Sequence, residues 1–206
     1  MKIKVCGMRE PENIIQLGAL EPDYIGFIFY PNSKRHVSSL DIEELNRIPK
    51  SIKKTGVFVN ENLSVILDNI KHYGLDAVQL HGDELPAFCK EVSQYGVEII
   101  KAFGVSANFD FKLLKPYINA ADYFLFDTQT PRRGGSGKSF DWQILDNYPY
   151  SKPYFLSGGI SLENIEEVKQ IKGQRLYAVD LNSCFEDEPG LKNIEKIKEA
   201  LMIINQ

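Results

Sequence analysis

The sequence predicts an α/β protein that forms one (βα)8 barrel, or TIM barrel, as a single domain over residues 1–206. Two observations predict it. Roughly eight short apolar runs alternate with amphipathic stretches, and the glycine-rich loops come late, after the sixth and seventh runs. The alternative is a doubly wound open sheet, which would usually need fewer strands and carry its phosphate loop after the first strand. The position of the loops therefore favours the barrel.

The apolar runs are expected to be strands. Most are apolar on both faces and rich in β-branched residues, as parallel strands buried on both sides are. The expected strands cover residues 3–6, 24–29, 55–59, 77–80, 98–103, 123–126, 154–156 and 176–181.

Helices are expected between the strands because apolar residues recur there at i, i+3 and i+4. The clearest helical stretches are residues 12–20, 63–73, 84–95, 162–172 and 191–204. Shorter helices are expected after Val37 and after Phe140. Residues 109–118 give the least regular pattern, because Pro116 interrupts it.

The composition is that of an ordinary globular chain and excludes several functional classes. Hydrophobic residues make up 43%, charged residues 25%, and the net charge is −4. Without a broad basic surface, neither nucleic acid nor a membrane is an expected partner. The three cysteines are widely spaced and suggest neither a disulfide framework nor a zinc site. With no signal-peptide pattern and no run long enough to cross a membrane, a cytoplasmic location is expected.

Polar residues stand at the ends of most expected strands. In a (βα)8 barrel the chemistry lies at the C-terminal ends of the strands, so these side chains would converge on one mouth. Core packing alone gives no reason for polar residues at so many strand ends. They are Cys6, the group Ser33, Lys34 and Arg35, then Asn60, Gln79, His81, Lys101, Asp127, Asp180, Asn182 and Ser183.

Glycine-rich segments suggest a phosphate site. Glycines let the backbone approach an anion, and barrels often bind phosphate at the loops after strands seven and eight. A single glycine-rich loop is weak evidence, but here three such elements follow consecutive strands. The three elements are the loop 132–138, which contains Gly135 and Gly137, the pair Gly158 and Gly159, and Ser183 after the eighth strand.

Cys6 and Asp127 are the candidate catalytic residues. A lone cysteine in a strand is more often a small core residue, but one at a strand end of this fold can act as a base once it is a thiolate. An aspartate at a strand end is often a cap, yet Asp127 leads into a glycine loop, and an apolar mouth would suit it as a general acid. Arg35 could hold a substrate carboxylate or be a solvated charge, and His81 could bind substrate or only backbone.

Lys101 leaves a second reaction open. A lysine in a barrel strand can form a Schiff base with a carbonyl substrate, as in aldolase-type chemistry, or form an ion pair inside the barrel. The histidines and carboxylates show no spacing typical of a metal site, so no metal is expected.

Several motifs occur in an order that resembles the phosphoribosylanthranilate isomerase family over nearly the whole chain. Individually some are weak, but the ordered combination is highly specific. The motifs are KVCGM at 4–8, IGFIF at 25–29, SKRHV at 33–37, GVFVN at 56–60, VQLHGDE at 78–84, IKAF at 100–103, Asp127, GGSGK at 134–138, FDW at 140–142, SGGI at 157–160, VDLNS at 179–183 and EDEPGLK at 186–192.

This resemblance implies an intramolecular aldose–ketose isomerase of tryptophan biosynthesis that needs no cofactor. The family converts N-(5-phosphoribosyl)anthranilate to 1-(2-carboxyphenylamino)-1-deoxyribulose 5-phosphate by an Amadori rearrangement. The partner implied is a small phosphorylated aminosugar substrate. Asp127 would be the general acid and Cys6 the general base. Arg35 would hold the anthranilate carboxylate with His81 nearby, and Asp180 would line the sugar pocket. The phosphate would be held by the backbone around Gly135–Gly137, Gly158-Gly159 and Asn182-Ser183.

Two residues depart from the family pattern in the eighth-strand motif. Asn182 replaces a serine, and Cys184 replaces a glycine whose backbone could have needed a positive φ. A barrel that has lost activity and only binds a phosphorylated metabolite therefore stays a competing hypothesis. The chain is expected to be a monomer or a homodimer.

Overall fold

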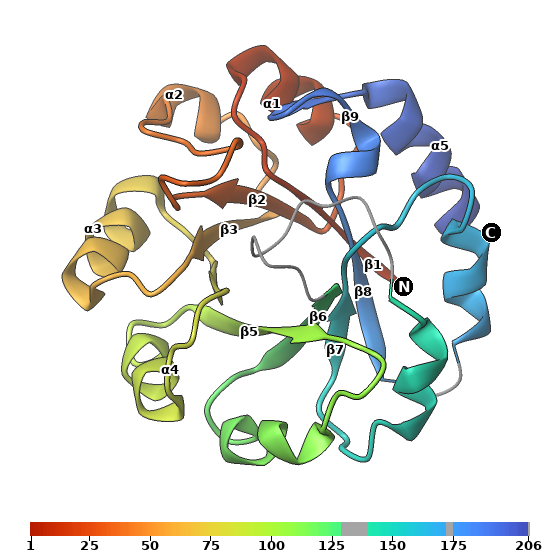
Figure 1. Ribbon diagram of the computed structural model, residues 1–206. Coiled ribbons are helices and arrows are strands. Elements are labelled where there is room, and N and C mark those ends of the chain that lie inside the picture. The colour runs from red at the N-terminus through yellow and green to blue at the C-terminus, as the bar shows by residue number, and fades with distance from the viewer. Residues whose placement is uncertain (129–139, 172–174, 206) are drawn as a thin grey trace.

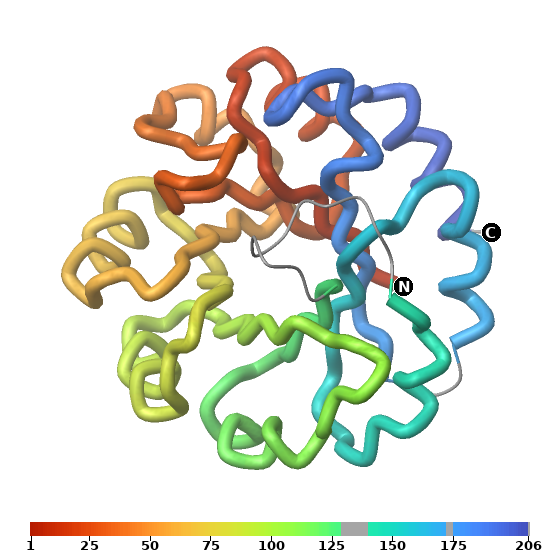
Figure 2. The backbone as a smooth tube through the Cα atoms, in the orientation of Figure 1, coloured from red at the N-terminus to blue at the C-terminus, as the bar shows by residue number. Residues whose placement is uncertain are grey.

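The structure is a computed structural model that describes residues 1–128, 140–171 and 175–205. Eight parallel strands pair in sequence order and close into a barrel, with β8 beside β1. Helices surround the strands, and the chain advances around the ring in sequence order until α5 lies beside α1 (Figures 1 and 2). The predicted (βα)8 barrel is confirmed.

The strands lie close to the predicted positions, and several are longer. Because β6 extends through residue 128, Asp127 lies within the strand rather than after it. The strands are β1 (Lys2–Cys6), β2 (Tyr24–Ile28), β3 (Lys53–Phe58), β4 (Ala77–Leu80), β5 (Glu98–Val105), β6 (Tyr123–Thr128), β7 (Tyr154–Leu156) and β8 (Leu176–Leu181).

The helices on the first half of the ring are mainly α-helices, and those on the second half are mainly 3-10 helices. Proline opens α1 and α4, where its missing N–H costs nothing. The α-helices are α1 (Pro11–Gly18), α2 (Ile42–Leu45), α3 (Leu63–Tyr73), α4 (Pro86–Ser93) and α5 (Ile194–Asn205). The 3-10 helices are η1 (Phe111–Tyr117), η2 (Trp142–Asn147), η3 (Ile165–Gln170) and η4 (Ser183–Phe185).

The predicted helix over residues 162–172 is wrong in type and length. The Asn164 side chain accepts a hydrogen bond from the Ser161 N–H at 2.8 Å and donates to the Gly159 carbonyl at 2.9 Å. This turn delays the helix until Ile165. Ile165 and Val168 are buried three residues apart, which fits the three-residue turn of a 3-10 helix.

The predicted helix over residues 191–204 begins too early. Residues 191 and 192 instead form β10 (Leu191–Lys192), which pairs antiparallel with β9 (Glu186–Glu188). Gly190, between the two strands, has φ of +95°, a conformation that favours glycine. The side chain of Asn193 then caps the start of α5 by accepting from Lys196 N–H at 3.0 Å.

Within the described residues, no helix is long and apolar enough to cross a membrane.

Candidate active site

The candidate catalytic residues come together at the mouth, meaning the C-terminal ends of the barrel strands. Cys6 ends β1, and Asp127 and Asp180 lie near the ends of β6 and β8. His81 directly follows β4. Because the strands are parallel and the sheet is closed, their ends share one rim.

Cys6, the last residue of β1, is enclosed on the side that faces β2. It is opposite Gly26 in the strand register, and a Cβ on Gly26 would lie 2.7 Å from the Cys6 Sγ. The thiol therefore occupies the space that this glycine leaves open. Cys6 is 3% exposed, and burial raises the pKa of its thiol despite the opposing charge of Lys4.

Lys4 joins Cys6 to Asp180 and was missed as a functional candidate. Its Nζ donates to Asp180 Oδ1 at 2.9 Å, and its charge acts on the Cys6 thiol, which lies two residues along β1 on the same face. Burial opposes its charge, but attraction to Asp180 and Cys6 outweighs this and raises the pKa of Lys4. A lysine two residues before Cys6 in an otherwise apolar strand was the available signal, because i and i+2 share one face.

Asp180 interacts electrostatically with both candidate catalytic residues. Burial raises the pKa of its carboxyl, Lys4 opposes the rise, and the charge of Asp127 adds to it. The same Asp180 charge raises the pKa of Cys6. Ser157 Oγ lies 3.5 Å from Asp180 Oδ2. Asp180 is thus electrostatically coupled to groups on opposite sides of the mouth.

The carboxylate of Asp127 is held by the backbone N–H of the next residue, and it faces His81. Its Oδ1 accepts from the Thr128 N–H at 2.8 Å, and its Oδ2 lies 3.4 Å from His81 Nε2. On the other side of the ring, Gln79 Nε2 lies 2.7 Å from His81 Nδ1. With the amide donating to Nδ1, the imidazole proton sits on Nε2 and points toward Asp127.

Arg35 is held by a carboxylate that was not singled out from the sequence. Its Nε lies 2.8 Å from Glu186 Oε1, and its Nη2 lies 2.5 Å from Glu186 Oε2. Among the described residues, none hydrogen-bonds Nη1. Since Glu186 takes the Nε–Nη2 edge, the Nη1–Nη2 edge is the one that can meet a second carboxylate.

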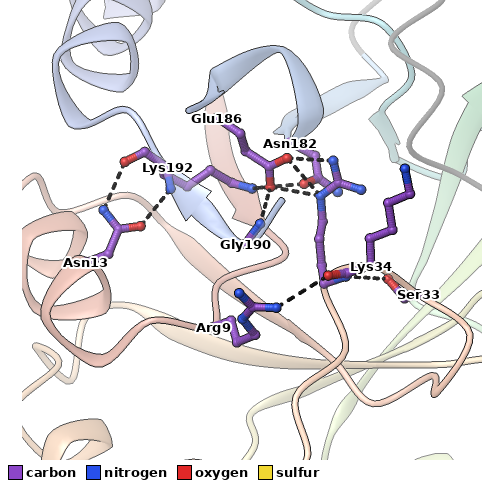
Figure 3. A network of polar contacts seen from close by, with 9 residues as sticks. Arg9, Asn13, Ser33, Lys34, Asn182, Glu186, Gly190 and Lys192 are labelled. Carbon is purple, nitrogen blue, oxygen red and sulfur yellow. Dashed lines mark hydrogen bonds and ion pairs between the residues drawn. The ribbon is translucent and has the colours of Figure 1, made fainter. Parts of the chain in front are cut away.

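Glu186 lies at the centre of a polar network (Figure 3). It also accepts from the Lys192 ammonium and from the Gly190 N–H. Lys192 in turn donates to Asn182 Oδ1 at 2.9 Å. Burial raises the pKa of Glu186, but hydrogen bonds from Arg35 and the charge of Lys192 outweigh it, so the net pKa is lowered. Glu186 therefore stays ionised at neutral pH.

The predicted phosphate-binding glycines can be placed only in part. Gly158 and Gly159 follow β7 with φ of +87° and +69°, respectively. A Cβ on Gly158 would lie 2.7 Å from Asp127 Oδ1, so only glycine fits there without displacing the carboxylate. Gly135 and Gly137 lie outside the described residues.

The eighth-strand departures introduce no positive φ. Asn182 and Ser183 directly follow β8, and Ser183 begins η4. Cys184 lies within η4, and its φ is not positive. Replacing the family glycine therefore causes no backbone strain at this position.

Lys101 has four oxygen partners around its ammonium group. Its Nζ donates to the carbonyls of Leu80, Gly82 and Ala102 at 3.1, 2.8 and 3.0 Å. Glu84 Oε2 lies 3.2 Å away. Burial lowers the pKa of Lys101, and Glu84 only partly offsets this. These contacts favour the predicted ion-pair role over the Schiff-base role.

Comparisons with known proteins agree on one family. The family model for N-(5'phosphoribosyl)anthranilate (PRA) isomerase matches residues 3–202. The N-(5'-phosphoribosyl)anthranilate isomerase of Parabacteroides distasonis is 45% identical, and the match covers 99% of this chain and 93% of that protein.

Solved structures of this kind share the fold. The phosphoribosyl anthranilate isomerase of Thermotoga maritima superposes with a TM-score of 0.84 at 35% identity, covering 100% of this chain and 98% of that one. A structure of monomers generated from the dimeric enzyme of Thermotoga maritima gives a TM-score of 0.80 at 31% identity, with the same coverage. A third structure contains reduced 1-(o-carboxyphenylamino)-1-deoxyribulose 5-phosphate, with a TM-score of 0.81, 31% identity and the same coverage.

Proposed function

The chain belongs to the N-(5'-phosphoribosyl)anthranilate isomerase family, and on that premise we propose that Cys6 and Asp127 are the base and the acid of its reaction. The protein is an isomerase of tryptophan biosynthesis that performs the Amadori rearrangement of N-(5-phosphoribosyl)anthranilate. The observation that carries the assignment is that Cys6 ends β1 and Asp127 lies near the end of β6, on one rim of the closed barrel, with Asp180 of β8 between these two strands. An acid and a base around one small substrate are what this rearrangement needs.

Asp127 performs the first proton transfer. Its carboxylic acid donates a proton to the ribose ring oxygen, and the bond from that oxygen to C1 breaks. The nitrogen lone pair of the anthranilate moiety forms the C1=N bond of a Schiff base, which is the substrate's own. The Nε2–H of His81, 3.4 Å from Oδ2, supports the carboxylate that remains.

Cys6 performs the second proton transfer. Its thiolate takes the proton from C2, the C–H electrons form the C1=C2 bond of the enolamine, and the iminium electrons return to nitrogen. A raised thiol pKa makes the thiolate scarcer at neutral pH but a stronger base. The thiol can then return its proton to C1 while the C2 hydroxyl proton passes to the Asp127 carboxylate. The ketone forms, and both groups regain their starting states.

The remaining site residues anchor the two ends of the substrate. The Nη1–Nη2 edge of Arg35 binds the anthranilate carboxylate, with His81 nearby. Asp180 lines the sugar pocket. The backbone of Gly158 and Gly159, together with Asn182, Ser183, Gly135 and Gly137, binds the phosphate.

The setting of the protein is also part of the proposal. It acts as the single barrel domain of residues 1–206, as a monomer or a homodimer. A cytoplasmic location is supported by its three cysteines, which are thiols and not disulfides.

Single-turnover fluorescence with freshly made phosphoribosylanthranilate tests the assignment. We expect wild-type conversion, and a rate loss of roughly 100-fold or more in both Cys6→Ser and Asp127→Asn. Cys89→Ser is the matched control, since Cys89 is a buried cysteine of α4, a helix outside the ring of strands (Figure 1). Full activity in either site variant would remove that residue from its role, and no wild-type conversion would support the inactive barrel.

A further inference from the structure

The ammonium group of Lys4 is placed between two acidic side chains inside the barrel. Lys4 pairs with Asp180 in the β1–β8 register, and its Nζ lies 2.9 Å from Asp180 Oδ1. Cys6 lies two residues further along β1, on the same face, and the charge of Lys4 acts on its thiol. Lys4 is fully buried, so water does not compete for its ammonium group.

A thiolate at Cys6 needs a positive neighbour because its surroundings are enclosed. Burying an unpaired anion is costly, and Gly26 opposite the thiol has no side chain to help. Three charged groups act on the thiol: Lys4 from β1, Asp180 from β8 and Lys192 from β10. Lys192 hydrogen-bonds Glu186 and Asn182, and of the two cations Lys4 acts more strongly on the thiol.

We propose that Lys4 is a positioning residue that stabilises the thiolate form of Cys6, and that Asp180 limits this effect by sharing the same ammonium group. Lys4 acts on the reaction only through Cys6, the residue that takes the proton. When the thiol loses its proton, the attraction between the Lys4 ammonium and the sulfur strengthens, because the sulfur then carries a negative charge. The inference rests on the proposed role of Cys6 as the base.

The test measures the ionisation of Cys6 directly rather than turnover. In a Cys89→Ser/Cys184→Ser background Cys6 is the remaining thiol, and the ultraviolet absorbance of the thiolate is followed against pH. Two variants are compared: Asp180→Asn, and Asp180→Asn combined with Lys4→Met. Replacing both members of the buried pair avoids leaving one charge alone, so the double variant is expected to fold.

Asp180→Asn should lower the pKa of Cys6, because Lys4 then serves the thiol alone. Adding Lys4→Met should raise that pKa by about one pH unit or more. Lys53→Met is the matched control: it removes one ammonium from the opposite end of the barrel, where Lys53 pairs with Glu98, and should leave Cys6 unchanged.

An unchanged Cys6 pKa on adding Lys4→Met would overturn the proposal and leave Lys4 a structural residue. This outcome is separate from the failure of the proposed function. If Cys6→Ser keeps full activity, Cys6 is not the base, whatever its titration shows.

Discussion

Two buried lysines of the barrel, Lys4 on the β8–β1 side of the mouth and Lys101 on the β4–β5 side, differ in what surrounds them. Lys101 donates to three backbone carbonyls and contacts Glu84. Lys4 is shared between two titratable side chains, Asp180 and Cys6. The pKa of Lys101 is lowered by burial, while that of Lys4 is raised because its acidic partners outweigh burial.

The difference separates a structural cation from one that acts on chemistry. Backbone carbonyls do not titrate, so three of the four oxygen partners of Lys101 keep their charge throughout a reaction cycle. Cys6 can change charge, and each change alters the electrostatic energy between its sulfur and the Lys4 ammonium. Burial and a carboxylate partner are common to both lysines, so these two features alone do not identify a functional lysine.

The largest expected effect is on stability, from Lys101→Met. This variant leaves Glu84 buried without its cation and three carbonyls without a donor, so unfolding free energy should fall by about 3–5 kcal/mol in denaturant titrations. The turnover of the folded variant should stay within about threefold of wild type. A collapse of turnover with an intact fold, or borohydride trapping of a substrate adduct on the wild-type chain, would instead make Lys101 a Schiff-base residue.

A smaller effect is expected on activity, from Gln79→Leu on the same side of the mouth. Loss of the amide donor leaves the His81 ring free to exchange its tautomer, so kcat should fall by about tenfold while the fold is kept. Single-turnover rates and circular dichroism would check this. Equal rates in Gln79→Leu and wild type would mean that the β4 end contributes only packing.

The smallest expected effect concerns pH and Glu186, on the Lys4 side. Its folded pKa lies below the ordinary value of 4.5, so its contribution to stability is present above that value and is lost as pH falls through the lowered pKa. From about pH 7 to about pH 3, wild type should lose ~1 kcal/mol more unfolding free energy than Glu186→Gln does. Glu10→Gln, an exposed partner of Arg9, is the control and should follow wild type. Parallel stability curves for Glu186→Gln and wild type would mean that Glu186 is not preferentially ionised in the fold.

Much of the architecture was predictable because it depends on local patterns. Continuous apolar runs indicated buried parallel strands, and polar residues at their ends indicated the mouth. Local patterns misled where a tertiary contact took over. The helical spacing from Leu191 onward is real, but pairing with β9 keeps the first two residues extended.

The sequence by itself determined which residues are polar at strand ends, and so pointed to Cys6, Asp127, Arg35 and His81. Only the tertiary structure decided which partners hold them. Glu186 is 151 positions from Arg35, and Asp180 is 176 positions from Lys4. Closure of the barrel places β8 beside β1 and so brings these residues into contact. Such pairings depend on a closed sheet rather than on sequence spacing, because the energy of a buried charge is set by its neighbours in space.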